Sequence, residues 1–289
     1  MLNNSLKHVT LSQNHMATTF VFRISLPERD APRAEACLAQ CHTLVDDLEN
    51  TLSEFKPESP LFKLNGAVPF EPISMASEAL ELLNLSRSLE MSTRGAFSAA
   101  AKGLGKFDES VRYSLTERTA QRLSQDSILS FGAIGKGFAL DRVRTQIESW
   151  GFQDYLLSAG GSSLVVSGFS ALSSPWQIGW SPNGKDSKVL LSHRSGLPIA
   201  LGISGLSEQG MHILDPRAKA PIAPVKSALV SHPSAAYADA LSTALFVLGW
   251  EEGLATFQTL VQKPSLALLD SNDEFHWNGT FQKHWGQLQ

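Results

Sequence analysis

Residues 155–192 of the chain read YLLSAGGSSLVVSGFSALSSPWQIGWSPNGKDSKVLLS, and this stretch decides the fold class. It alternates short runs rich in β-branched and aromatic residues with Gly-Gly, Gly-Phe-Ser and Pro-Asn-Gly, which is the turn chemistry of antiparallel hairpins. We therefore predict a meander of strands at Tyr155 to Ala159, Ser163 to Ser167, Trp176 to Trp180 and Lys188 to Ser192.

Further strands are predicted on both sides of this stretch. Residues 16–26 are rich in β-branched and aromatic residues and indicate a first strand. After the meander, strands fit at Ile199 to Ser204 and at Ser227 to His232, and residues 265–277 resemble one more hairpin.

Helices are predicted mainly before the meander. A stripe of apolar residues runs from Cys37 to Phe55 at spacings of three or four, after Asp30 as a cap and Pro32 in the first turn. Two more helices are expected at about 75–92, capped by Ser74, and at about 137–150. A last helix, capped by Ser234, is expected to end at Gly249.

Because helices cluster early and strands late, without strict alternation, we predict the α+β class. The expected architecture is a two-lobed single unit, with an N-terminal helix-rich part and a C-terminal part rich in antiparallel strands. One domain would span residues 1–289, with residues 1–15 as an N-terminal extension.

Composition narrows the function classes. The 289 residues are 43% hydrophobic and carry a formal net charge of -4, which is the wrong sign for a protein that holds nucleic acid by bulk electrostatics. Cys37 and Cys41 lie four residues apart in a predicted helix, which fits a reducing compartment. Residues 1–15 hold no apolar run for a signal peptide, and no run reaches about 18 residues, so we expect a cytoplasmic protein without a membrane span.

Three segments could carry chemistry. Residues 131–137, FGAIGKG, let backbone amides approach an anion such as a diphosphate at a helix start, with Lys136 as a cation, although a plain tight turn would have the same sequence. Asp239 and Thr243 stack a carboxylate and a hydroxyl on one helix face, which suits Mg2+ or Ca2+ but also an ordinary polar face. His212 could act as acid or base, or be structural.

Common signatures of other enzymes are absent from the sequence. Ser130 stands where a Walker A loop needs its first glycine, and Gly137 follows the lysine. The chain also has no H-E-x-x-H, C-x-x-C or G-x-S-x-G motif, so zinc proteolysis, thiol redox chemistry and serine hydrolysis have no sequence support.

Seven segments, taken in order, resemble the FAD:protein FMN transferases, the ApbE family, formerly described as thiamine-biosynthesis lipoproteins. They are MATT at 16–19, LSEF at 52–55 with Ser59 and LN at 64–65, GAF at 95–97 with GL at 103–104, GAIGKGFALD at 132–141, SAGG at 158–161, HILDPR at 212–217 and ADALSTA at 238–244. The last two are similar to the family's H-I-I-D-P-R and A-D-A-L-A-T-A.

The resemblance implies a transferase that cleaves FAD, attaches FMN through a phosphoester to a Thr or Ser of an acceptor protein, and releases AMP. It implies Mg2+ as cofactor, FAD as substrate, and an acceptor site of the type Asp-x-x-Ser/Thr-Gly/Ala-Ala-Thr/Ser. The metal ligands carried over are Asp239, Thr243, the neighbouring Ser242 and the carbonyl of Ala133. Carried over to the flavin nucleotide are Met16, Phe55, Ala96, Phe97, Ser98, Ser130, Lys136 and Ile213. His212 is the catalytic candidate, because it could accept the acceptor's proton.

The sequence departs from the family pattern around the nucleotide. Aspartates of the family are Ser98 and Ser130 here, a tyrosine is Phe55 and a glutamate is Pro60. Ser98 and Ser130 favour one alternative to the transferase, a non-catalytic FAD-binding protein. A third possibility keeps catalysis but directs the attack to water, which gives an FAD diphosphatase that yields FMN and AMP.

Overall fold

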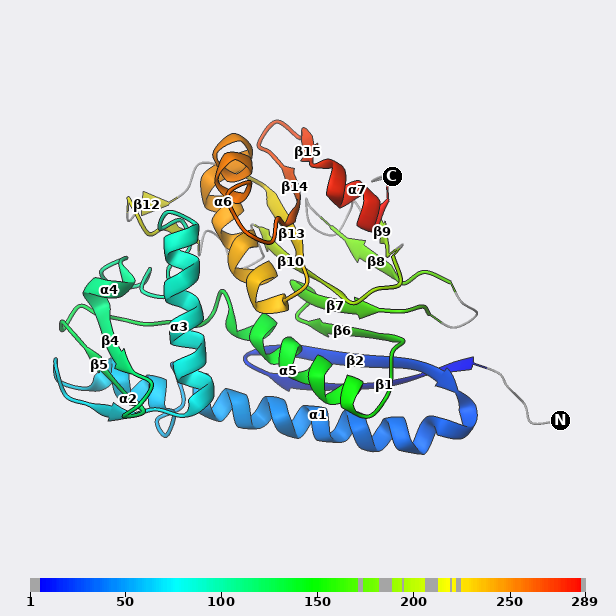
Figure 1. Cartoon of the computed structure of the whole chain (residues 1–289), viewed down its shortest axis with the longest axis horizontal. Coiled ribbons are helices and arrows are strands. Elements are labelled where there is room, and N and C mark those ends of the chain that lie inside the picture. Colours follow the sequence, from blue (N-terminus) through cyan, green and yellow to red (C-terminus); the bar gives the residue numbers. More distant parts are fainter. Residues whose placement is uncertain are drawn as a thin grey trace.

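The computed structural model describes residues 6–170, 174–181, 189–193, 195–205, 213–218, 220–221 and 225–286. Its centre is an eight-stranded sheet in the order β1-β2-β6-β7-β10-β13-β14-β15, in which every pair of neighbours is antiparallel (Figure 1). These strands are β1 (Leu6–His15), β2 (Thr18–Pro27), β6 (Tyr155–Ala159), β7 (Ser163–Ser167), β10 (Ile199–Gly205), β13 (Ser227–His232), β14 (Ser265–Leu269) and β15 (Phe275–Trp277).

The N-terminal segment differs from the sequence prediction. Residues 6–15, expected to be an extension, form the edge strand β1 and pair with β2 along their whole length. Most side chains of β1 are exposed, so the segment lacks the apolar alternation by which a strand is found in a sequence. The turn between the two strands consists of Met16 and Ala17, with φ of 48° and 59°.

The predicted meander is right in its two hairpins and wrong in joining them into one sheet. In the main sheet β7 lies between β6 and β10, whereas β8 (Gln177–Trp180) and β9 (Val189–Ser192) pair with each other in a separate two-stranded sheet. Turn chemistry identifies a hairpin but not the sheet to which it belongs. A second apolar cluster covers one face of the main sheet and includes Trp176, just before β8, Trp180 of β8 and Trp285 of the helix α7 (Gly279–Trp285).

The other face of the main sheet is covered by three helices, α1 (Ala31–Leu52), α5 (Gly135–Ser149) and α6 (Ala235–Phe257) (Figure 1). Since both faces are covered, all five residues of β7 are buried, with Val165 in one apolar cluster and Leu164 and Val166 in the other. The helix α6 is kinked at Gly249, where φ is 72° and ψ is -176°, and continues to Phe257, so its predicted end marks a kink instead.

A smaller part of the molecule comes from residues 60–122, between α1 and α5. It contains the helices α2 (Pro60–Gly66), α3 (Ser77–Ser92) and α4 (Phe107–Ser110) and a sheet of β3 (Ile73–Ser74), β5 (Thr119–Arg122) and β4 (Val111–Ser114), at the left of Figure 1. The short strands β11 (Leu214–Asp215) and β12 (Ala220–Pro221) pair with each other. The α+β class is thus confirmed, with the correction that the strand-rich part also takes in the N-terminal hairpin. In the described part of the chain, no helix combines the length and apolarity that a bilayer crossing requires.

Candidate active site

Strand register brings distant polar segments to one edge of the main sheet. Thr18 starts β2, Ala159 ends β6, and Ser163 opens β7 opposite Gly202 of β10. The backbone N–H of Gly160 donates to the carbonyl of Thr19 at 2.9 Å. The turn of Met16 and Ala17 and the segment 158–161, two of the motifs of the family resemblance, therefore lie side by side.

Two glycines allow α6 to approach this edge closely. A Cβ atom on Gly137 of α5 would lie 2.1 Å from the carbonyl oxygen of Ala235, and one on Gly202 would lie 2.2 Å from that of Ala238. Neither contact is possible for a residue with a side chain. The first turns of α6 are thus held against both α5 and the sheet, and this fixes the residues that follow.

Asp239 of α6 is the centre of the candidate site. Its Oδ2 accepts hydrogen bonds from the backbone N–H of Gly137 at 2.7 Å and from the hydroxyl of Ser163 at 2.8 Å. The residue is only 6% exposed. Burial raises the pKa of its carboxyl to about 7, although the positive charge of Lys136 and the two hydrogen bonds act in the opposite direction.

A cluster of hydroxyls lies next to the backbone carbonyl of Asp239. The Oγ of Ser204 on β10 lies 2.9 Å from the Oγ of Ser242 and 3.2 Å from the Oγ1 of Thr243. Both α6 hydroxyls also donate to the backbone carbonyl of Asp239, at 2.8 and 3.3 Å. Such a bond from Thr243 back to a carbonyl also occurs on an ordinary polar helix face, so the role of Thr243 as a metal ligand stays a prediction.

These groups fit a hard divalent cation. Carboxylate, hydroxyl and carbonyl oxygens are the ligands of Mg2+ and Ca2+. Both hydrogen bonds to the Asp239 carboxylate fall on Oδ2, so Oδ1 has no hydrogen-bond partner among the described residues. A buried carboxylate with a raised pKa is stabilised in its charged form by a bound cation. Ala133 lies in the turn directly before α5, two residues from the start of the helix.

The helix α6 begins on a second, half-buried carboxylate. Asp141 of α5 accepts hydrogen bonds from the backbone N–H groups of Ala235 and Ala236, at 2.8 and 3.0 Å, and from the Ser234 hydroxyl at 2.6 Å. Ser234 was the predicted cap, and its Oγ does accept from the N–H of Tyr237. Asp141 therefore explains why GAIGKGFALD ends in an aspartate: it anchors the helix that carries Asp239.

The residues predicted to line the flavin pocket come from five separate segments. Phe55, just after α1, is 76% exposed. Ala96 and Phe97 are buried in the turn after α3. Met16 and Ile213 are half-buried against the main apolar cluster.

The two serines that replace family aspartates lie in different surroundings. The Ser130 hydroxyl donates to Oε1 of Glu54 and accepts from the backbone N–H of Gly132 at 3.3 Å. The Ser98 hydroxyl accepts from the N–H of Ala100 at 3.1 Å. A carboxylate from elsewhere in the chain thus bonds to Ser130.

His212 lies outside the described residues, so its place in the site stays a prediction. The sequence reasoning missed Ser163, Ser204, Glu54 and Asp141 as site residues. Asp141 had a signal, since it closes a motif that was recognised. The two serines and Glu54 act through contacts across the fold that no local pattern marks.

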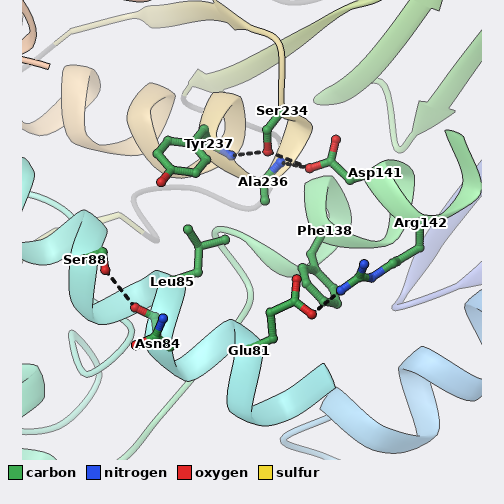
Figure 2. A pocket seen from close by; sticks show the side chains of 10 residues that line it. All are labelled: Glu81, Asn84, Leu85, Ser88, Phe138, Asp141, Arg142, Ser234, Ala236 and Tyr237. Carbon is green, nitrogen blue, oxygen red and sulfur yellow. Dashed lines mark hydrogen bonds and ion pairs between the residues drawn. The ribbon is translucent and has the colours of Figure 1, made fainter. Parts of the chain in front are cut away.

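A cavity of 340 Å3 lies between α3, α5 and α6 (Figure 2). Its walls include Asn84, Arg142, Ser234 and Tyr237, and Arg142 forms an ion pair with Glu81 across it. None of the predicted flavin or metal residues lines this cavity. Tyr237 and Asp239 lie two residues apart on α6 and so point in roughly opposite directions, which separates the cavity from the candidate metal site.

The fold and the oxygen-rich cluster on α6 define a protein with a candidate divalent-cation site at one edge of an antiparallel sheet. The sequence profile of the ApbE family matches residues 16–267, so the chain belongs to the ApbE family. The chain is 25% identical to the FAD:protein FMN transferase of Klebsiella pneumoniae (strain 342), over 86% of this chain and 80% of that protein. It is 24% identical to the FAD:protein FMN transferase of Vibrio cholerae serotype O1, over 93% and 90%.

Solved structures show the same fold. The flavin transferase ApbE from Vibrio cholerae superimposes with a TM-score of 0.83 at 19% identity, covering 96% of this chain and 99% of that one. The apo form of the Pseudomonas stutzeri flavinyl transferase ApbE gives a TM-score of 0.82 at 22% identity, covering 99% of both chains. The family and the fold class expected from the sequence are therefore confirmed.

Proposed function

We propose that this protein transfers FMN from FAD to a Ser or Thr hydroxyl of an acceptor protein, in a reaction that depends on Mg2+ and releases AMP. The enzyme class is that of its relatives: the curated proteins that the chain matches are named FAD:protein FMN transferases. The cation, the acceptor hydroxyl and the leaving group are the parts that need testing.

One observation carries the proposal: the carboxylate of the buried Asp239 bonds to the glycine turn that holds Lys136, and its backbone carbonyl accepts from the hydroxyls of Ser242 and Thr243. Asp239, Ser242 and Thr243, with the carbonyl of Ala133, would hold Mg2+. Lys136, whose charge acts on Asp239, would face the diphosphate. Phosphoryl transfer requires chiefly positioning and neutralisation of negative charge, which these groups can provide.

The transfer step requires only groups that this chain, FAD and the acceptor possess. When bound, Mg2+ would neutralise charge on the diphosphate. The acceptor oxygen forms a bond to the phosphorus on the FMN side, the bond from that phosphorus to the bridging oxygen breaks, and AMP leaves. The hydroxyl proton passes to His212 or to a nearby carboxylate.

Intact-mass analysis tests the reaction directly. The purified protein is mixed with FAD, Mg2+ and an acceptor carrying an Asp-x-x-Ser/Thr-Gly/Ala-Ala-Thr/Ser site, with and without EDTA. We expect the acceptor to gain one FMN only when EDTA is absent, and AMP to appear in equal amount. Free FMN and AMP without an adduct would favour the diphosphatase, and bound, intact FAD would favour a binding protein.

His212→Ala separates catalysis from binding. If His212 accepts the proton, the variant loses transfer far more than it loses FAD affinity, which equilibrium titration of FAD fluorescence measures. Equal losses in both would instead make His212 a binding residue.

A further inference from the structure

The carboxylate of Glu54 is built into the candidate flavin site, although its own position matches no motif residue. Glu54 follows α1 directly, and only 13% of its side chain is exposed. Its Oε1 accepts a hydrogen bond from the hydroxyl of Ser130, a residue 76 positions away in the sequence. Both of its oxygens also accept from the ammonium of Lys102, at 2.8 and 2.9 Å.

This network joins three segments around the exposed ring of Phe55. The backbone N–H of Ser130 donates to the carbonyl of Ala99 at 2.8 Å, in the segment after the predicted flavin turn. The ammonium of Lys102 lies 5.7 Å from the centre of the Phe55 ring. Glu54 therefore lies where the end of α1, the segment 96–102 and the turn before α5 meet.

Bonding to Glu54 fixes what the Ser130 hydroxyl can offer a ligand. A serine hydroxyl has one proton to donate and two lone pairs to accept. The proton points to Glu54 and one lone pair accepts from Gly132, so one lone pair is left, and it has no partner among the described residues. Ser130 is half-buried, so a ligand can reach this lone pair.

We propose that Glu54 is a positioning and specificity residue, which makes Ser130 an acceptor for an N–H or O–H donor of the flavin nucleotide and, in its ion pair with Lys102, sets the charge at this point. The pair would then do jointly what one carboxylate at position 130 does alone. This inference rests on the proposed function, because it names a contact of the same flavin site.

Moving the carboxylate from position 54 to position 130 tests this proposal. Glu54→Gln keeps the size and an acceptor for Ser130 but removes the charge, so we expect FAD to bind about tenfold more weakly, with kcat at saturating FAD changed less than threefold. Ser130→Asp alone sets two carboxylates side by side, so FAD affinity becomes dependent on pH as one of them takes up a proton.

The double variant Glu54→Gln with Ser130→Asp restores a single carboxylate that an amide can bond, so FAD affinity should return to within about threefold of wild type. Glu58→Gln, in the same loop and paired with Lys63 at the surface, is the matched control and should bind FAD like wild type. FAD affinity is measured by fluorescence titration, without acceptor.

Two results would overturn the inference: Glu54→Gln binding FAD as tightly as wild type, or a double variant whose loss is the sum of the two single losses. In either case wild type still binds and transfers FMN, so the proposed function stands. A wild-type chain that failed to bind FAD would refute both, which keeps the two failures distinguishable.

Discussion

The backbone N–H of Gly137 donates a hydrogen bond to Oδ2 of Asp239, 2.7 Å away, and so joins two segments that are 102 residues apart in the sequence. One is the glycine turn at the start of α5, and the other is the helix with the candidate metal ligands. The bond exists because Gly137 has no side chain to keep α6 away. The two motifs that looked weak separately are therefore parts of one site.

Asp239→Asn should abolish metal-dependent transfer while the fold remains. The amide keeps the shape but loses the charge that holds a cation, so we expect transfer to fall by roughly a hundredfold or more. Because burial raises the pKa of this carboxyl, the ionised form is unfavourable without metal, and the metal-free variant should melt at the same temperature as wild type or higher.

Glu251→Gln is the matched control for Asp239→Asn, because Glu251 is exposed on the same helix. Transfer is measured by intact mass and melting by circular dichroism, both in EDTA and in Mg2+. An Asp239→Asn variant that kept full Mg2+-dependent transfer would remove Asp239 from the metal site.

Gly137→Ala should destabilise the protein even though alanine favours helices more than glycine does. Its Cβ would meet the Ala235 carbonyl at 2.1 Å, and both atoms lie on packed helices, so the backbones must separate. We expect a loss of about 1–3 kcal/mol in the free energy of unfolding, measured in urea. Gly66→Ala, whose Cβ would have no neighbour within 4 Å, is the control and should change stability by less than about 0.5 kcal/mol. Equal behaviour of the two variants would mean that α5 and α6 are not in close contact.

Mg2+ affinity should depend on pH around neutrality. The Asp239 pKa is raised to about 7 in the metal-free protein, so below that pH a proton competes with the cation. We expect the apparent Kd for Mg2+ to rise toward tenfold for each unit by which the pH falls below 7, and to level off above it. Calorimetric titrations between pH 5.5 and 8.5 measure this.

Ser163→Ala is the variant that tests the cause of this pH dependence. It removes a hydrogen bond that lowers the Asp239 pKa, so the curve of Kd against pH should move to higher pH.

The effect of Asp239 on folding stability has the opposite sign to that of a usual aspartate. Since its pKa in the folded protein exceeds that in the unfolded chain, the metal-free protein gains stability from this group as pH falls from about 7 toward 4. A pH-independent Kd would contradict the assignment.

Local patterns predicted much of the fold because apolar runs and turn residues mark most of its elements. The strands at 155–159, 163–167 and 227–232 were found at their observed bounds, since their apolar runs are bounded by turns. The edge strand β1 was missed because its side chains face water on most positions. The pairing of β7 with β10 could not be predicted either, because a long-range partner leaves no mark in a short window.

The candidate site, too, could be predicted only in part from the sequence. Asp239 and Thr243 were found because helical spacing alone puts them on one face. Ser163 and Ser204 were not, because their closeness to Asp239 depends on how α6 crosses the sheet. Glu54, the carboxylate that bonds to Ser130, was missed for the same reason, because it lies 76 residues away in the sequence.

His232 should make the protein sensitive to acid through the start of α6. The imidazole is 4% exposed, its Nδ1 accepts from the backbone N–H of Ser234 at 3.1 Å, and its ring stacks on Tyr237 at 4.8 Å. Burial lowers its pKa from 6.5 to about 4, so the fold requires the neutral form. The resulting stability is complete above pH 6.5 and is lost as pH falls from 6.5 to about 4, by an amount on the order of 3 kcal/mol. Urea unfolding at pH 7.5 and 4.5 measures this difference.

His232→Asn, which keeps an acceptor for Ser234 but does not titrate, should flatten that part of the stability profile. If wild type and variant lost stability in parallel between these two pH values, the acid sensitivity would arise from other groups and His232 would be a packing residue only.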